Sequence, residues 1–381
     1  MSRVSRFANL GLILALLLSA THTARGETLA REGAGWLEDI AGYLVLHLEG
    51  THHEMGVQHG KLLREHIRQN VQFLIHETGE ESIADVGPLS ITPNKVIPQI
   101  INIQRRHVPA KYWEELQGLA EGSGLPIEDV QAANFIPELF HCSGFALMNS
   151  ATKDGTLYHG RVLDYGVDMR LQEHAVLIVA KPKGGIPFVN ISYAGFIGSV
   201  TGMNAEHVSI GEMGGNGLGQ WDGVPMAFLV REVLETAGDL DAAVSVFRDS
   251  PRTCEYYFVI ADGKSNRALG MEAGASRFEI IEPNTAHPLL PKPVKDAVLL
   301  SAGSRYDELV RRTQKNHGHF TAEEALRLMD RPVAMKSNLH NALFEPKSTR
   351  FWVANANEKG EPAADQKYSA FRLSELLTRK P

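Results

Sequence analysis

Three scarcities in this sequence narrow what the protein can be. Only two of its 381 residues are cysteine, Cys142 and Cys254, which is too few for a disulfide framework. Beyond residue 26, no apolar run is long enough to span a bilayer. Lysine and arginine (38) are fewer than aspartate and glutamate (45), so the formal net charge is −7, without a basic stripe. These features argue against nucleic acid as a partner and against stable membrane insertion.

The first 26 residues are typical of a secretion signal. Arg3 and Arg6 precede a short apolar run from Leu10 to Leu18, and small residues follow it. The run is short for a bilayer span, although an uncleaved anchor is the alternative. We therefore expect a secreted or periplasmic protein, or a lysosomal one if the source is a eukaryote.

Residues 27–141 are predicted to be mainly helical after one opening strand, Tyr43–Glu49. A helix from Glu54 to about Glu77 follows the break at Gly50. Proline is tolerated in the first turn of a helix, so three prolines mark further helix starts: Pro93, Pro109 and Pro126.

From Cys142 onward, short apolar runs alternate with Gly, Asp and Asn, which is typical of strands. The predicted strands are 145–149, 156–163, 175–180, 188–193, 208–210, 256–260, 268–272, 278–281, 341–344 and 351–354. The predicted helices are 226–237, 240–247, 306–312 and 322–329, the last with a capping-box spacing. Helices and strands in blocks favour an α+β fold with antiparallel sheets.

The most informative stretch surrounds Cys142. Lys153-Asp-Gly155 predicts a hairpin between two strands. Paired strands lie ~5 Å apart, so Arg161 and Asp164 on the second strand can reach the cysteine that opens the first. A guanidinium favours the nucleophilic thiolate. A buried structural thiol is the alternative for Cys142, and a structural ion pair is the alternative for Arg161 and Asp164.

A cut just before Cys142 would give this residue a free α-amine as well as a thiol. An α-amine has a reference pKa of ~7.7–8.0, so it can both take and return a proton near neutral pH. A carboxylate such as that of Asp164 can hold the amine by a charge-assisted hydrogen bond. This chemistry requires neither a catalytic histidine nor a metal or organic cofactor.

The run Cys142-Ser-Gly-Phe-Ala146, followed by His159-Gly-Arg-Val-Leu-Asp-Tyr165, resembles the N-terminal-nucleophile hydrolases of the penicillin acyltransferase-like group. This group comprises relatives of acyl-CoA:6-aminopenicillanate acyltransferase, with bile salt hydrolase and acid ceramidase as more distant kin. The resemblance implies a four-layer αββα sandwich of two antiparallel sheets. It also implies self-cleavage between His141 and Cys142, with Cys142, Arg161 and Asp164 as the catalytic residues.

The resemblance extends over about residues 40–375. Thr201-Gly-Met-Asn204 is similar to the Gly-Met-Asn turn of the group, and the segments 49–56, 338–346 and 351–354 resemble its other motifs. The chain differs where many relatives place the asparagines of the oxyanion hole and pocket. Candidate oxyanion or substrate residues are therefore Asn204, Glu212, Asn216 and Ser301. For Glu212, a substrate contact and a solvated loop charge both remain open.

Together these features predict a proenzyme that acts on a linear amide bond of a small molecule such as an N-acyl amine or N-acyl amino acid. Residues 27–141 would form the small chain, which stays bound to a catalytic domain of residues 142–381. One alternative is a lipid-amide or phospholipid hydrolase on the same fold. Another is a non-catalytic secreted binding protein.

Overall fold

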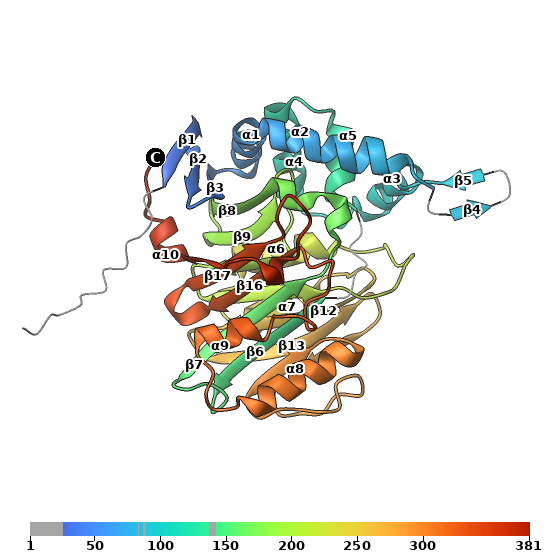
Figure 1. The fold of residues 1–381 in the computed structure, drawn as a ribbon. Coiled ribbons are helices and arrows are strands. Elements are labelled where there is room, and N and C mark those ends of the chain that lie inside the picture. The colour runs from blue at the N-terminus through green and yellow to red at the C-terminus, as the bar shows by residue number, and fades with distance from the viewer. Residues whose placement is uncertain (1–25, 83, 87–88, 137–141) are drawn as a thin grey trace, which may run out of the picture.

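Two β-sheets form the centre of the molecule (Figure 1). The computed structural model describes residues 26–82, 84–86, 89–136 and 142–381, so residues 1–25 of the predicted signal lie outside it. The first sheet has ten strands, in the spatial order β1 (Glu27–Glu32), β2 (Gly35–Ile40), β3 (Tyr43–Gly50), β8 (Ala175–Pro182), β9 (Phe188–Tyr193), β10 (Thr201–Asn204), β11 (Val208–Met213), β12 (Glu255–Asp262), β13 (Arg267–Gly274) and β14 (Phe278–Ile281).

The second sheet has six strands, in the order β15 (Ala297–Leu300), β6 (Ser143–Asn149), β7 (Gly155–Leu163), β16 (His340–Glu345), β17 (Arg350–Asn355) and β18 (Ser369–Arg372). Neighbouring strands in both sheets are antiparallel except for β3 and β8, which are parallel. A short hairpin of β4 (Ala84–Val86) and β5 (Leu89–Ile91) projects away from the body (Figure 1).

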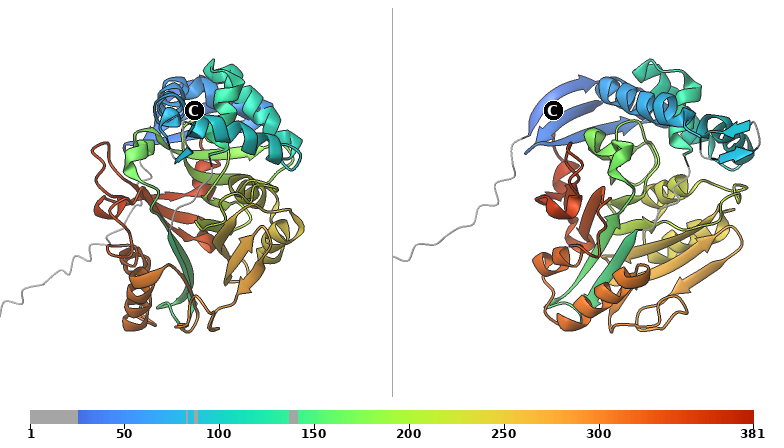
Figure 2. Two further views of the ribbon diagram at one scale, coloured as in Figure 1. Left: turned by 90° about the vertical axis from the view of Figure 1, so that its right-hand side faces the viewer. Right: turned by 45° about the vertical axis from the view of Figure 1, so that its right-hand side comes forward.

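The sheets pack face to face, with β6 and β7 against β11 and β12. Helices α6 (Met226–Thr236) and α7 (Leu240–Asp249) cover the outer face of the ten-stranded sheet. Helices α8 (Gly303–Lys315) and α9 (Ala322–Arg327) pack against the six-stranded sheet, as the two views in Figure 2 show. This arrangement confirms the predicted α+β class and the αββα sandwich.

Alternation along the strands makes the sandwich possible, because successive side chains point to opposite faces of a sheet. Phe258 of β12 packs on Phe247 of α7, with ring centroids 4.4 Å apart, so it belongs to the helix-covered face. Its neighbour Tyr257 points to the other face, toward the six-stranded sheet. The cysteine and its surroundings lie on this inner side.

The segment before Cys142 begins with three strands rather than the one predicted. Only β3 was expected from the sequence. Strand β1 is polar and exposed, so its extended state depends on pairing with β2 and not on an apolar pattern of its own. Since β3 pairs with β8, this segment continues the sheet of the later part of the chain.

Five helices complete this segment: α1 (His52–Leu62), α2 (Arg64–Val71), α3 (Pro93–Gln104), α4 (Ala110–Ser123) and α5 (Ile127–Asn134). They gather at one end of the sandwich (Figure 1). The three prolines do mark helix starts. The helix predicted to run from Glu54 to Glu77 is instead divided into α1, α2 and a π-helical stretch, Gln72–Glu77. It begins at His52, where Thr51 and Glu54 form a capping box.

Helices α1 and α4 cross at very short range because both present glycine at the crossing. A Cβ on Gly56 would lie 2.1 Å from the carbonyl oxygen of Glu115, and one on Gly118 would lie 2.2 Å from that of His53. Side chains are therefore excluded from this crossing. The close packing fixes α1 against β3 and β8, which the helix also contacts.

Three further strands of the two sheets differ from the expectation, among them β18, which was not predicted and pairs with β17. Thr201–Asn204, predicted as a turn, is strand β10, because it pairs with both β9 and β11. Ala297–Leu300, not predicted as a strand, pairs with β6 at the edge of the second sheet. Among the described residues, no helix combines the length and the apolarity that crossing a bilayer requires.

Candidate active site

Cys142 lies immediately before β6 and is 4% exposed. Strands β6 and β7 form the predicted hairpin, in which Gly144 faces Arg161 and Ser143 faces Val162. Asp164 follows directly after β7. The hairpin therefore brings Arg161 and Asp164 to the end of the sheet where Cys142 begins the paired strand.

Arg161 is fully buried between the sheets. Its aliphatic stem rests on Gly211 of β11, where an added Cβ would lie 2.9 Å from the Cδ of the arginine. The guanidinium donates a hydrogen bond to the carbonyl oxygen of Val162 and forms an ion pair with Glu212, at 3.3 Å from its Oε2. A buried guanidinium needs such a partner to offset its lost hydration.

Glu212 is thus neither in a loop nor solvated. It lies within β11, is 1% exposed and pairs with Arg161. The interpretation as a solvated loop charge is wrong, because the glycine-rich stretch becomes irregular only after Met213. A role in substrate contact stays a prediction.

Asp164 is held by two groups from distant parts of the chain. The backbone N–H of Met335 donates to its Oδ1 at 2.9 Å, and the guanidinium of Arg305 on α8 donates to its Oδ2 at 2.6 Å. Sequence reasoning missed Arg305, which stands 141 residues away from Asp164 and belongs to no motif. Only the packing of α8 onto the second sheet brings the two together.

The electrostatic surroundings of the Cys142 sulfur combine opposing effects. Burial raises the pKa of the thiol, and the charge of Arg161 opposes this. The carboxylates of Glu212 and Asp164 raise the pKa further, whereas a hydrogen bond from the Asp164 backbone lowers it. The net shift is upward, so the thiol of the uncut chain is protonated at neutral pH.

Two buried histidines lie near Arg161 and stay neutral. Burial, with help from the charge of Arg161, lowers the pKa of His159 to about 3 and that of His340 well below its usual value. The two ring nitrogens of His340 are hydrogen-bonded to the hydroxyls of Tyr193 and Thr201, at 2.8 and 2.9 Å. His340 therefore fills a structural position beneath the site.

Cys142 opens into a pocket of about 300 Å³. This size is at the lower end of the range for small-molecule sites. Asn216 and Ser301, both predicted from the sequence, line the pocket, and Ser301 is hydrogen-bonded to Ser143 at 2.7 Å. The other lining residues are Met213, Gly214, Gly215, Glu255, Tyr257, His287, Leu289, Leu290, Leu300, Ala302 and Gly303.

Asn204 does not belong to this group. Its side-chain amide donates to the carbonyl oxygens of Leu234 and Ala237, and its Oδ1 accepts from the N–H groups of Glu206 and Val208. It thereby fixes the turn before β11, whereas the pocket begins at the other end of that strand. Six residues of strand span about 17 Å. The structure therefore separates Asn204 from Cys142, and His141 lies outside the described residues.

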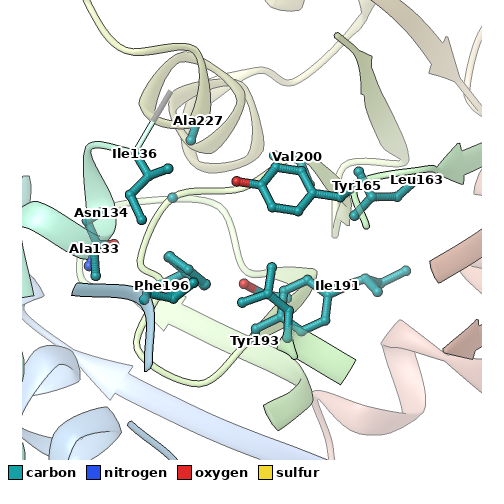
Figure 3. Close-up of a pocket in the computed structure, with 14 residues that line it drawn as sticks. Ala133, Asn134, Ile136, Leu163, Tyr165, Ile191, Tyr193, Phe196, Val200 and Ala227 are labelled. Atoms are coloured by element: carbon teal, nitrogen blue, oxygen red, sulfur yellow. The ribbon is translucent and has the colours of Figure 1, made fainter. Parts of the chain in front are cut away.

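A second, apolar pocket lies between α5 and the sheets (Figure 3). Tyr165, Tyr193 and Phe196 border it, together with Leu163 next to Asp164. Its volume is about 70 Å³, which is enough for only a few non-hydrogen atoms. The larger pocket at Cys142 is therefore the candidate site for a small molecule.

One cluster of His and Glu side chains at the end of the sandwich has spacing suited to a metal ion: His52, Glu115 and Glu235. A guanidinium already supplies the cation there, since Arg231 lies 3.1 Å from Glu115 and 2.6 Å from Glu235. The chemistry of this cluster is thus that of a buried ion-pair network.

The chain is similar to several known proteins. The chain is 24% identical over 379 residues to protein dcd1B of Dictyostelium discoideum, with 88% of this chain and 75% of that protein covered. It is 24% identical to the N-acylethanolamine-hydrolyzing acid amidase of Caenorhabditis elegans over 43% of this chain and about half (51%) of the amidase. The solved Caenorhabditis elegans ortholog of that amidase aligns with a TM-score of 0.44 and 17% identity, covering 54% of this chain and 93% of its own.

The family match covers more than half of the chain. Residues 150–360 match the family described as acyl-coenzyme A:6-aminopenicillanic acid acyl-transferase. The matched range includes Arg161, Asp164 and the pocket residues from Met213 to Gly303. This match confirms the resemblance inferred from the motifs around Cys142. The chain therefore belongs to the acyl-coenzyme A:6-aminopenicillanic acid acyl-transferase family.

Proposed function

We propose that this protein is a cysteine amide hydrolase or acyltransferase, activated by a cut between His141 and Cys142. The observation that carries the proposal is the position of Cys142. It stands directly before β6, in the lining of a pocket, and the paired strand β7 carries Arg161 and leads into Asp164.

The first step would be self-cleavage. The Cys142 thiol attacks the carbonyl carbon of His141, the peptide C–N bond breaks, and a thioester forms as the α-nitrogen takes a proton. Water then hydrolyses the thioester, which releases a carboxylate on His141 and a free thiol and amine on Cys142. The new amine, when protonated, adds a positive charge beside the sulfur and favours the thiolate.

The mature site would then act on an amide substrate. The thiolate attacks the amide carbonyl, and the α-amine of Cys142 returns a proton to the departing amine. Water or an acceptor amine resolves the resulting acyl-thioester. Asp164 would hold the α-amine and Arg161 would favour the thiolate. Gly214, Gly215 and Asn216 line the pocket, and their backbone N–H groups or the Asn216 amide would serve as oxyanion donors.

Denaturing mass spectrometry of the purified protein tests the cut. Wild type should give two fragments that meet at His141/Cys142, and Cys142→Ala should give one intact chain. Cys254→Ala is the matched control, because Cys254 is also buried and burial raises the pKa of its thiol to about 11; this variant should still be cut. A single chain in active wild type would overturn the processing step.

A screen of N-acyl amino acids, N-acyl amines, penicillins and acyl-CoA thioesters addresses the substrate, together with labelling of Cys142 by a thiol-reactive probe. The name of the Caenorhabditis elegans relative favours lipid amides as a second candidate class. Activity on N-acyl amino acids but not on N-acylethanolamines would separate the two. Absence of labelling would instead favour a non-catalytic binding protein.

We also propose that residues 1–26 direct export and are removed. N-terminal sequencing of the protein recovered from the medium or periplasm should then begin at residue 27. Recovery of the intact N-terminus from the membrane fraction would support the anchor alternative.

A further inference from the structure

Next to the Cys142 pocket stands a row of acidic groups that the proposed mechanism does not use, of which Glu255 lines the pocket itself. Tyr257 of β12, Glu272 of β13 and Glu279 of β14 stand directly opposite one another across three strands. Glu255 lies two residues before Tyr257 and therefore on the same face. Like charges at opposed positions such as Glu272 and Glu279 destabilise a sheet unless a cation compensates them.

The compensation by this chain is incomplete. Arg277 lies 3.2 Å from Glu272 and 3.3 Å from Glu279, but its side chain is 63% exposed. Glu272 is fully buried, and neither of its carboxylate oxygens makes a hydrogen bond with the described residues. Glu255 lines the pocket and accepts a hydrogen bond from Tyr257 at 2.9 Å, without an ion-pair partner in the described part of the chain. Two carboxylates thus share one guanidinium, and Glu255 has no ion pair with the described residues.

His287 completes the wall and argues against a metal ion there. Its spacing with Glu272 and Glu279 would suit a metal. However, its Nδ1 accepts a hydrogen bond from the N–H of Leu289 at 3.2 Å, so the ring proton resides on Nε2. A protonated Nε2 is a donor and not a metal ligand. The side chain is 6% exposed, and this Nε2 makes no hydrogen bond with the described residues.

Much of the remaining lining of the pocket is apolar. Met213, Leu290 and Leu300 line it beside Cys142, and Leu289 at its rim is 60% exposed. A largely apolar pocket whose lining includes Glu255, a carboxylate without an ion-pair partner among the described residues, suits a ligand with an aliphatic stem and a cationic head. The stem buries apolar surface, and the head supplies the missing counter-charge.

We propose that the Cys142 pocket selects amide substrates that carry an alkyl-ammonium or alkyl-guanidinium group, with Glu255 as the residue that contacts the cation. This inference rests on the proposed amide hydrolysis and adds the substrate class. Glu272 and Glu279 add negative charge on the strands beside Glu255, and the Nε2 of His287 lies 3.4 Å from the carboxylate of Glu279.

Matched substrate pairs test the selection. One pair places the charge on the amine side, Nα-octanoyl-lysine against Nα-octanoyl-Nε-acetyl-lysine. The other pair places it on the acyl side, 6-aminohexanoyl p-nitroanilide against the isosteric heptanoyl p-nitroanilide. We expect kcat/KM to be at least tenfold higher for the cation in one pair. This preference should decrease as salt is added, because Glu255 is partly exposed.

Glu255→Gln should reduce the ratio of cationic to neutral kcat/KM to within about threefold of one. The matched control is Glu206→Gln, which removes a carboxylate that pairs with Lys264 at the surface, in the turn that leads into β11. This control should keep the wild-type ratio. Equal ratios in Glu255→Gln and wild type would overturn the role of Glu255.

The outcomes separate the inference from the function on which it rests. Labelling of Cys142 and hydrolysis of both members of each pair at the same rate would overturn the inference and leave amide hydrolysis intact. If no amide is hydrolysed, calorimetry on Cys142→Ala still tests whether the pocket prefers a cation, by comparing the binding of hexylamine with that of hexanol. Tighter binding of hexylamine, weakened in Glu255→Gln, would support it, and equal binding would contradict it.

Discussion

At the scale of single residues, the candidate site depends on charges that are buried in compensating pairs. Arg161 forms an ion pair with Glu212. The guanidinium of Arg161 lowers the pKa of the Cys142 thiol, and the carboxylate of Glu212 raises it. Arg305 in turn fixes Asp164. The sequence motif identified Cys142, Arg161 and Asp164. The side chains that pair with Arg161 and Asp164 come from other strands and helices.

Removal of either member of the Arg161–Glu212 pair should destabilise the fold by about 3–5 kcal/mol, because the remaining charge is buried without a partner. The double variant Arg161→Gln/Glu212→Gln should recover part of this loss, as urea denaturation would show. Thiol reactivity supplies the second measurement. Arg161→Gln should slow the labelling of Cys142, and Glu212→Gln should accelerate it. Shifts in the same direction would contradict the opposing effects on the pKa of the thiol.

A pH effect is expected from His59. Its Nε2 accepts a hydrogen bond from the N–H of Gly195 at 3.1 Å, and burial lowers its pKa from 6.5 to about 3. Between these values the unfolded chain binds a proton that the folded chain does not. The stabilisation is therefore complete above about pH 6.5, and it is lost as the pH falls toward 3, by about 1.4 kcal/mol per pH unit.

The variant His59→Gln isolates this contribution, since the amide oxygen of glutamine can still accept from Gly195. Its free energy of unfolding, measured by urea denaturation between about pH 6 and about pH 4, should fall less steeply with acid than that of wild type. The other buried histidines titrate in both proteins and cancel in the difference. Parallel slopes would show that His59 titrates normally.

At the scale of elements, helix starts and strand pairing have different origins. Proline placement marked α3, α4 and α5 because it acts locally. The contact between α1 and α4 instead requires glycine on both helices. The spacing of Gly56 and Gly60 on one helix, and of Gly118 and Gly122 on the other, was the available signal in the sequence. This spacing shows that a glycine recurs about once per helical turn on one face of each helix. It does not show which other helix packs against that face.

Gly118→Ala should therefore cost about 2–3 kcal/mol of stability, because the new Cβ meets a backbone carbonyl oxygen that cannot move alone. Thermal denaturation would measure this loss. Gly238→Ala is the matched control, since a Cβ there meets nothing within 4 Å and its backbone has no positive φ; it should change stability by under about 1 kcal/mol. Similar losses in both variants would show that the crossing is not tight.

At the scale of the whole molecule, the segments before and after Cys142 form one structure. Strand β3 pairs with β8 in the same sheet. A buried network also joins the segments, because Arg231 and Glu235 of α6 meet Glu115 of α4 and His52 of α1. Arg231 is 2% exposed, so the charges of this network compensate one another away from solvent. A cut before Cys142 would leave these contacts intact.

The two fragments of the cut protein should thus elute together from a sizing column and separate only in denaturant. Arg231→Gln should lower the urea concentration at which they separate, because it leaves Glu115 and Glu235 buried without their cation. Arg311→Gln is the control: Arg311 is 61% exposed and pairs with Glu308 within α8, so its removal should change little. Separation of wild-type fragments without denaturant would contradict this account.

The sequence alone determined what local physics controls. It specified the hairpin that aligns Cys142 with Arg161 and Asp164, most strands from Cys142 onward and the helix starts at proline. The tertiary structure decided what depends on distant pairing. It placed β1 and β2 in the sheet, moved Glu212 from an expected loop into a buried ion pair, separated Asn204 from the pocket and recruited Arg305 to Asp164. A local sequence pattern predicts turns and the buried face of a strand or helix. The partner of a buried charge is decided only when the sheets and helices pack together.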